Sequence, residues 1–307
     1  MENQPITLTD ALPSQLSKAL FEGARRLRSG GIETGRLDAE LLLGHILGLT
    51  REQLMVGANR LLSSEQREEY ADVLRRRLQR EPVAYITSRQ EFWSLDFDVT
   101  SDILIPRPET ERLVEIALKL GAEMSMGGAL RILDIGTGNG AIAIALASEL
   151  PAAEIFATDV SEAALVVARG NAVKHRIAAR MQFLRGDLFE AISDVKVAYD
   201  LILANPPYIR RGEIDELEPE VSQWEPRGAL DGGVDGLDFY RRIAAEACHY
   251  LRPNGAVVVE MGADMGAAVV TLFESPGGYA GAQIYQDYSG KDRVVVARKR
   301  TTKTNLT

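Results

Sequence analysis

Short apolar runs alternate with helical patterns along the second half of the chain, and this alternation limits the possible folds most. The first two runs lie at 131–135 and 154–158, with an alanine-rich helical pattern at 141–150 between them. Later runs lie at 181–185, 199–204 and 256–260. Strands that alternate with helices form βαβ units with parallel strands, and ligands bind at the carboxyl ends of those strands. The sequence therefore predicts an α/β fold with a mostly parallel sheet.

A glycine-rich loop closes the first apolar run and opens the helical pattern. Strand, glycine loop and helix in this order are the context of a nucleotide site, because glycines let backbone N–H groups approach a ligand closely. The spacing differs from the G-x-G-x-x-G of dinucleotide loops and favours S-adenosylmethionine, which has no pyrophosphate. The candidate cofactor-binding residues here are Asp134, Gly136, Thr137, Gly138, Asn139 and Gly140.

Acidic residues follow the next two apolar runs. Asp159 ends the run at 154–158, at about the distance from the glycine loop expected of a carboxylate that binds ribose hydroxyls. The run at 181–185 is followed by Gly186, Asp187 and Leu188, so Asp187 and Leu188 are candidates to border an adenine ring. A glycine loop with a ribose acid would by itself also suit NAD.

The most informative motif is Asn205-Pro206-Pro207-Tyr208, directly after the run at 199–204. Proline cannot donate to a sheet ladder, so Asn205 stands at the carboxyl end of a strand. The Asn205 amide oxygen and the Pro206 carbonyl can accept both hydrogens of a flat NH2 group, while Tyr208 can lie against its plane. The plain structural alternative is a strand-ending turn with a buried tyrosine. Together with the glycine loop and Asp159, the motif favours a site that positions an amino or amide nitrogen.

The chain resembles the HemK/PrmC family of protein-glutamine methyltransferases, which modify peptide chain release factors. Besides the motif at 205–208, the matching segments lie at 38–43, 104–111, 225–240 and 287–295, and the likeness runs from about Leu16 to Ala297. Two positions depart from the family pattern: Ser88, where the family usually has glycine, and Leu188, where some relatives carry tryptophan.

The resemblance implies a Rossmann-like class I methyltransferase sheet, mostly parallel with an antiparallel edge, joined by a β-hairpin to a small N-terminal all-α bundle. It implies methyl transfer from S-adenosylmethionine to the side-chain amide nitrogen of a glutamine in the GGQ-type motif of class 1 release factors, supporting translation termination. Asn205, Pro206 and Tyr208 would be catalytic, and Asn205 would also border the cofactor. The substrate would further contact Pro207, Pro108 and Glu109.

Four segments are expected along the chain. Residues 1–85 form the helical bundle that recognises substrate, 86–106 the hairpin linker, 107–300 the catalytic domain and 301–307 a tail. In the linker, the stretch 92–99 pairs with 103–105, and Trp93 packs in the joint. The segment 210–236 is long, polar and rich in Glu, Pro and Gly, which favours a partner-binding lid over an irregular surface excursion.

The charge distribution disfavours nucleic acid as the direct substrate. The whole chain carries −9, and residues 1–90 contribute 13 basic and 12 acidic side chains, or +1, so the remainder carries −10. A DNA- or RNA-modifying enzyme needs a basic stripe to neutralise phosphates. Arg75, Arg76, Arg77 and Arg80 form one local basic cluster, which we interpret as a solvated helix face; contact with an acidic partner is the alternative.

Other sites and locations receive little support from the sequence. The single cysteine, Cys248, fits a packed thiol, and His45, His175 and His249 have no metal-ligand spacing. No apolar run reaches the ~20 residues of a membrane span, and the amino terminus has no signal pattern, so a cytoplasmic protein is expected. The oligomeric state is not determined by the sequence, and a monomer is the default expectation.

Three alternative functions remain open at this point. An adenine-amino methyltransferase acting on DNA also uses an Asn-Pro-Pro-Tyr motif, to hold an exocyclic NH2 group. Such an enzyme further needs base flipping and a phosphate-binding surface. A related enzyme methylates a glutamine of a ribosomal protein, although the stretch 106–111 favours the release-factor branch. A third alternative is a non-catalytic S-adenosylmethionine-binding scaffold. Such a protein would have no use for the arrangement of Asn205 and Tyr208 around an NH2 group, here called the NH2 clamp.

Overall fold

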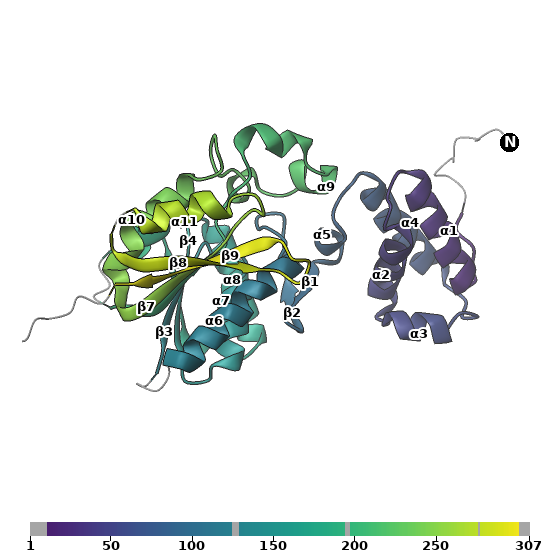
Figure 1. Ribbon diagram of the computed structural model, residues 1–307. Coiled ribbons are helices and arrows are strands. Elements are labelled where there is room, and N and C mark those ends of the chain that lie inside the picture. Colours follow the sequence, from purple (N-terminus) through teal and green to yellow (C-terminus); the bar gives the residue numbers. More distant parts are fainter. Residues whose placement is uncertain (1–10, 125–128, 194–196, 276, 301–307) are drawn as a thin grey trace, which may run out of the picture. The chain divides into compact units, whose positions relative to one another are not determined.

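The chain forms two compact units in the computed structural model, which describes residues 11–124, 129–193, 197–275 and 277–300 (Figure 1). One unit, here called the helical unit, comprises residues 1–88 together with 218–224. The other, called the sheet unit, comprises residues 89–217 and 225–307. The tail expected at 301–307 lies outside the described residues.

The helical unit contains the bundle predicted from the sequence. Its helices are α1 (Leu16–Ser29), α2 (Gly35–Leu47), α3 (Arg51–Val56), α4 (Ser64–Leu78), α5 (Val83–Thr87) and the short α9 (Pro219–Ser222). Ser63 caps α4, within a reciprocal capping box with Gln66. The sequence pattern did not predict α5, whose start follows Pro82 directly. Apolar side chains from α1, α2 and α4, including Leu27, Leu42 and Leu74, form one buried core.

The sheet unit is built on a seven-stranded sheet in the order β5-β4-β3-β6-β7-β9-β8. Its first five strands in this order are parallel, and β9 is antiparallel to both of its neighbours. This arrangement confirms the predicted fold class, including the antiparallel edge. The strands are β3 (Arg131–Ile135), β4 (Glu154–Asp159), β5 (Met181–Arg185), β6 (Tyr199–Ala204), β7 (Leu251–Glu260), β8 (Tyr279–Gln286) and β9 (Asp292–Lys299).

Helices cover both faces of this sheet (Figure 1). Alternate residues of each strand enter separate cores: in β6, Leu201 and Leu203 pack on one face while Ile202 packs on the other. The first face is covered by α6 (Glu111–Met124), α7 (Ala141–Glu149) and α8 (Glu162–Lys174), and the second by α10 (Asp238–Tyr250) and α11 (Gly266–Glu274). Short 3₁₀ turns lie at Pro108–Thr110 (η1), Ala178–Arg180 (η3), Leu188–Ile192 (η4), Arg211–Glu216 (η5) and Arg227–Ala229 (η6).

The hairpin after residue 88 differs from the prediction. Only β1 (Arg89–Phe92) and β2 (Leu95–Asp98) pair, joined by a tight turn at Trp93 and Ser94, whose φ angles are 54° and 56°. The stretch 103–105 forms no strand, so its predicted pairing was wrong. Ile103 and Ile105 are nevertheless buried, which explains why their apolar run resembled a strand. Trp93 packs on the first core, and its indole N–H donates to Glu149 at 2.9 Å.

No helix in the described part of the chain has both the length and the apolar character needed to cross a membrane.

Candidate functional site

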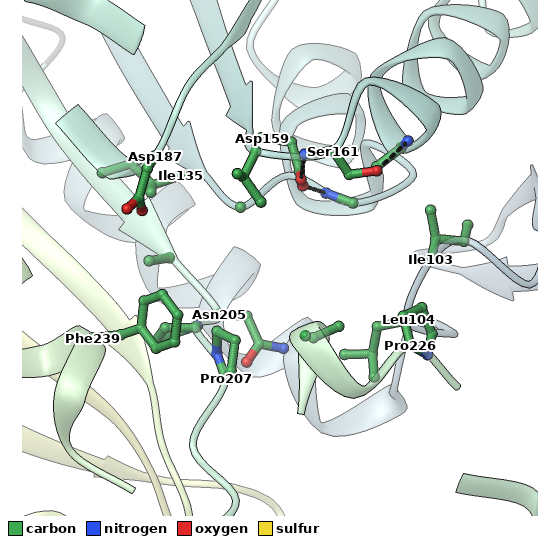
Figure 2. Close-up of a pocket in the computed structure, with 18 of the residues that line it drawn as sticks. Ile103, Leu104, Ile135, Asp159, Ser161, Asp187, Asn205, Pro207, Pro226 and Phe239 are labelled. Carbon is green, nitrogen blue, oxygen red and sulfur yellow. Dashed lines mark hydrogen bonds between the residues drawn. The ribbon is translucent and has the colours of Figure 1, made fainter. Parts of the chain in front are cut away.

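A cavity of about 280 Å³ lies in the sheet unit at the carboxyl ends of β3, β4, β5 and β6. The chain leaves β3 toward β4 on one side and returns on the other side as β6, so β3 and β6 flank the point where strand order reverses. Ligands of open α/β sheets bind at this position. Ile135 pairs with Ala204, so the glycine loop and Asn205 begin side by side. Figure 2 shows Asp159 and Asn205 on opposite sides of the cavity.

The glycine loop turns sharply at three positions, with φ of 70° at Gly136, 57° at Gly138 and 86° at Gly140. Such angles strain any residue with a side chain. Gly136 and Gly138 line the cavity, and a Cβ built there would meet no atom within 4 Å. A Cβ at Gly140 would lie 2.9 Å from Ile144 Cδ1, so this glycine serves packing instead. The loop therefore offers bare backbone to a ligand at two of the three glycines.

Asp134, Thr137 and Asn139 support the loop from behind and do not line the cavity. The Thr137 hydroxyl donates to Asp134 Oδ2 at 2.6 Å, and Asn139 Oδ1 accepts the Ala141 N–H at 3.2 Å. Burial raises the pKa of the Asp134 carboxyl to about 7, although hydrogen bonding to Thr137 opposes the rise. Within the described residues, Asp134 Oδ1 makes no hydrogen bond.

Asp159 lies at the carboxyl end of β4 and lines the cavity. Its two carboxyl oxygens accept the backbone N–H groups of Gly138 and Ser161, each at 2.9 Å (Figure 2). Burial raises the pKa of the carboxyl, and these backbone hydrogen bonds oppose the rise. Each oxygen keeps a further lone pair, so the carboxylate can still accept hydroxyl groups.

Asp187 and Leu188 lie next along the wall, after β5. Leu188 is buried with φ of 51°, a left-handed angle that is unusual for a leucine. Residues held in such angles are common at ligand sites. Asp187 pairs with Arg242 at 2.8 Å, and the Phe239 ring lies on the same side of the cavity as Asp187 (Figure 2).

The Asn-Pro-Pro-Tyr segment is divided between the cavity and the core. Asn205, Pro206 and Pro207 line the cavity, whereas Tyr208 packs on the second core. Burial raises the pKa of Tyr208 to about 12. Asn205 Nδ2 donates to the Thr110 hydroxyl at 3.2 Å, and none of the described residues donates to Asn205 Oδ1. This side-chain amide oxygen is therefore available to an incoming donor.

Pro108 and Glu109, predicted to bind substrate, are exposed and do not line this cavity. Their neighbour Thr110 is buried and contacts Asn205 through the hydrogen bond described above. The stretch 108–110 therefore reaches the site through Thr110. The sequence indicated Pro108 and Glu109 rather than Thr110, because a single turn such as η1 can point any of these residues inward.

Several lining residues were not predicted from the sequence. An apolar side of the cavity is formed by Ile103, Leu104 and Pro226 (Figure 2), and Gly228 and Ala229 also line the cavity. Glu225 fastens this side, because its buried carboxylate pairs with Arg107 and accepts the Ile105 N–H. The signal was present in the two family-like stretches, but their contact across about 120 positions of sequence could not be read from the chain.

The segment 210–236 is neither unstructured nor one piece. It contains η5, α9 and η6, and its middle stretch 218–224 belongs to the helical unit. Arg77, with a side chain only 6% exposed, joins Asp38 and Glu220 at 2.7 Å each. Arg80 pairs with Glu218 and Glu220, and the Trp224 indole N–H donates to Gln79 O.

The interpretation of the arginine cluster as a solvated face was therefore wrong. Arg76 pairs with Glu81 and Arg75 with Asp72, while Arg77 and Arg80 are joined to the chain's own acidic segment. Only Arg75 resembles an ordinary solvated position, with a side chain 54% exposed. Among the described residues, no three or more His, Cys, Asp or Glu side chains are grouped to hold a metal. Cys248 is half-buried on α10.

Comparison with known proteins agrees with this architecture. The PrmC N-terminal domain family matches residues 18–87, and the methyltransferase small domain family matches residues 118–218. A release factor glutamine methyltransferase from Moorella thermoacetica is 43% identical over 93% of this chain and 99% of its own length. One from Geobacter sulfurreducens is 43% identical over 89% of this chain and 92% of its own length.

Solved structures with the same sheet include the catalytic domain of hMettl16 in complex with MAT2A 3′UTR hairpin 6. It shares 18% identity, covers 72% of this chain and 81% of its own length, and has a TM-score of 0.57. The N-terminal domain of human METTL16 in complex with SAH shares 20% identity over 68% of this chain and 77% of its own, with a TM-score of 0.50. At this level of sequence identity, the two similarities show the shared fold alone.

Proposed function

The chain belongs to the family of release factor glutamine methyltransferases, and we propose that it methylates the side-chain amide nitrogen of a glutamine in a peptide chain release factor. One observation carries the assignment of the clamp: Asn205 stands at the carboxyl end of β6 with Nδ2 bonded to Thr110, which leaves Oδ1 for a substrate donor. A glutamine amide presents two N–H donors in one plane, and the Pro206 carbonyl can accept the second.

S-adenosylmethionine fits the residues around the cavity. Gly136 and Gly138 offer backbone without side chains, Asp159 offers carboxylate oxygens for ribose hydroxyls, and Leu188 and Phe239 offer apolar surface to an adenine. When bound, this cofactor supplies an electrophilic methyl group carried on a sulfonium. Asp134, Thr137, Asn139 and Gly140 would act indirectly, by holding the loop in its ligand-ready conformation.

The residues of this chain would act mainly by positioning. An amide nitrogen is a weak nucleophile because its lone pair is delocalised, and it is too weakly acidic for a side chain to ionise readily. Two accepted hydrogen bonds, at Asn205 and Pro206, would fix its direction and raise its electron density. Tyr208 would limit access of water to the amide from its place in the core behind the motif. The proton that leaves the amide can pass to solvent during or after transfer.

We assign recognition of the release factor to the helical unit and the segment 210–236, and Pro108 and Glu109 are exposed candidates for its outer contacts. Pro226, Gly228 and Ala229 of the segment line the cavity, while 218–224 are held by Arg77 and Arg80 of the helical unit. One continuous stretch of chain thus contributes residues to both units. A substrate that serves translation termination would place the enzyme in the cytoplasm.

Exchanging Glu220 for lysine tests this assignment, because it would release 218–224 from Arg77 and Arg80. We expect KM for intact release factor to rise about tenfold, with cofactor affinity unchanged. The matched control is Asp72→Lys, which breaks only the exposed pair with Arg75. An unchanged KM in Glu220→Lys, or an equal rise in both variants, would contradict the assignment.

The substrate itself is tested by incubating the protein with methyl-labelled S-adenosylmethionine and three acceptors in separate reactions. The acceptors are release factor, a ribosomal protein mixture and unmethylated DNA. We expect label on one glutamine of the release factor. Label on DNA or ribosomal protein alone would overturn the substrate while keeping the NH2 clamp, and cofactor binding without transfer to any acceptor would favour a non-catalytic scaffold.

A further inference from the structure

Behind the Asn205 amide, a row of three polar side chains, here called the relay, ends at a buried carboxyl group. Asn205 Nδ2 donates to Thr110 Oγ1 at 3.2 Å, and the Thr110 hydroxyl lies close enough to the Glu260 carboxyl to lower its pKa. Glu260 ends β7, the neighbour of β6 in the sheet, and is 1% exposed; Thr110 is 4% exposed. In the described part of the chain, Glu260 Oε2 makes no hydrogen bond. A buried carboxyl oxygen without a partner requires an explanation beyond packing.

The charge state of Glu260 decides the direction of every bond in this relay. An ionised carboxylate can only accept, so the Thr110 hydroxyl must donate to it. The Thr110 oxygen then has lone pairs only for Asn205 and must receive an N–H. Asn205 therefore presents its NH2 group to Thr110 and its oxygen to the cavity. A protonated Glu260 could donate instead, and the relay would lose its fixed direction.

We propose that Glu260 and Thr110 are positioning residues that hold the Asn205 amide with its oxygen, rather than its nitrogen, toward a substrate NH2 group. The proposal rests on the proposed function, because an amide or amino substrate is what needs an acceptor at this point. A flipped Asn205 would direct two N–H groups at the N–H groups of the substrate. Binding in the reactive orientation would then be lost without any change in cavity shape.

Several charged or titratable groups face Glu260 from the elements packed around it. Burial raises the pKa of the Glu260 carboxyl to about 7, and hydrogen bonding to Thr110 is the largest opposing influence. The charge of Arg293 on β9 and that of Arg107 favour ionisation, whereas Glu109 opposes it. Tyr208 and Tyr240 also lie close enough to feel the carboxylate charge. Because the ionised form fixes the relay, turnover should rise with pH across the neutral range.

The first test exchanges Thr110 for valine, which keeps the shape and removes the hydroxyl, and for serine, which restores it. We expect Thr110→Val to lower kcat for release factor methylation about 10- to 100-fold while cofactor affinity changes less than about threefold. Thr110→Ser should recover most of the rate. A Thr110→Val enzyme with wild-type kcat, or a serine variant as slow as the valine variant, would overturn the proposal.

The second test follows kcat against pH in the wild type and in Glu260→Gln. We expect the wild-type rate to rise through the neutral range to a plateau. Glu260→Gln should be slower than that plateau and should lack the rise, because its amide can both donate and accept. A Glu260→Gln enzyme that retains the wild-type profile would contradict a directing role for the carboxylate.

The third test uses Asn205→Asp, which replaces the donor facing Thr110 by an acceptor. The introduced carboxylate and Glu260 would then compete for the single Thr110 proton, so this variant should be slow. Adding Glu260→Gln supplies a donor at the other end of the relay, and the double variant should be faster than Asn205→Asp alone. Additive losses would contradict the relay, since independent structural damage accumulates. Absence of transfer by the wild type would instead reject the proposed function itself.

Discussion

Among the described residues, two buried carboxyl groups of the sheet unit lack the arginine partners that buried carboxyl groups of the helical unit have. In the helical unit, Arg77 joins Asp38 and Glu220, and Arg36 and Arg51 both pair with Glu40. In the sheet unit, Asp134 and Glu260 are fully buried and each has an oxygen without a hydrogen-bond partner among the described residues. The paired groups hold segments of chain together. Asp134 and Glu260 lie at or near the carboxyl ends of β3 and β7, and neither lines the cavity.

The pKa of Glu22 and Glu40 in the helical unit is lowered, whereas the pKa of the two unpaired groups in the sheet unit is raised. In the helical unit, hydrogen bonding to Arg25 lowers the pKa of Glu22 to about 2. In the sheet unit, burial raises the pKa of Asp134 and of Glu260 to about 7. A carboxyl group that is costly to ionise destabilises the fold near neutral pH, so its presence is better explained by function than by stability. The comparison teaches that Asp134 and Glu260 differ from the other buried carboxyl groups in having no arginine partner in the described part of the chain. Glu225, which pairs with Arg107 but has a pKa raised by burial, shows that pairing alone does not lower the pKa.

The largest effect should come from breaking a paired group. Arg77→Met would leave the buried Asp38 without its cation and remove one of the two arginines that pair with Glu220, and should cost the helical unit about 3 kcal/mol of unfolding free energy. The unfolding of each unit can be followed separately by tryptophan fluorescence, because Trp224 belongs to the helical unit and Trp93 to the sheet unit. Denaturant unfolding followed by Trp224 fluorescence in a Trp93→Phe background measures the loss. An unchanged midpoint would show that pairing contributes nothing to this unit.

A smaller effect should appear when the unpaired groups lose their charge. For Glu260 the folded pKa exceeds its ordinary value of 4.5, so the folded state holds a proton that the unfolded state releases. Stability of the sheet unit should therefore fall as pH rises from about 4.5 to about 7, then level off. Glu260→Gln should remove part of this fall and gain on the order of 2 kcal/mol at pH 8.

The helical unit should show the reverse dependence on pH. The pKa of Glu22 is lowered from 4.5 to about 2, so its stabilising contribution is present above pH 4.5 and is lost as pH falls toward 2. Unfolding of Trp93→Phe and Trp224→Phe proteins between pH 3 and 8, one tryptophan per unit, measures the two trends in parallel. Equal slopes in both units would remove the distinction between paired and unpaired carboxyls.

The smallest effect is expected at Arg75, whose pair with Asp72 is exposed on both sides. Arg75→Gln should change unfolding free energy by less than about 0.5 kcal/mol, because solvent screens such pairs. The measurement is the same Trp224 unfolding curve. Arg75→Gln is a matched comparison for Arg77→Met, because the two arginines are two residues apart in sequence but differ strongly in burial. A large loss at Arg75 would mean that burial does not decide the worth of these pairs.

Much of the sheet unit could be predicted from the sequence. The pattern of apolar residues predicted the positions of β3, β4, β5 and β6, because each strand is a short apolar run with a glycine, acidic or proline residue at or just after its end. The same patterns led to the glycine loop, Asp159 and Asn205 as neighbours at one edge of the sheet, and the structure brings them to one cavity. The prediction of a strand at 103–105 was wrong because buried loop residues are apolar as well, so their pattern resembles a short strand.

The remainder depends on contacts that no local pattern records. Glu260 ends β7 just as Asp159 ends β4, but its importance appears only when β7 lies beside β6 and brings it to Thr110. Arg77 and Arg80 resembled part of a solvated face because their acidic partners, Glu218 and Glu220, are about 140 positions away. Long-range ion pairs of this kind leave no periodic signal in either segment.

The central claim is that the Asn205 amide holds a glutamine NH2 group for methylation. It is tested most directly by peptide mass spectrometry of release factor after incubation with S-adenosylmethionine and either wild-type protein or Asn205→Ala, with cofactor affinity measured alongside. We predict one methyl group on one glutamine with the wild type. Asn205→Ala should lose at least about 100-fold in rate and keep cofactor affinity within about tenfold. Full methylation by Asn205→Ala, or methyl groups on residues other than glutamine, would contradict the account.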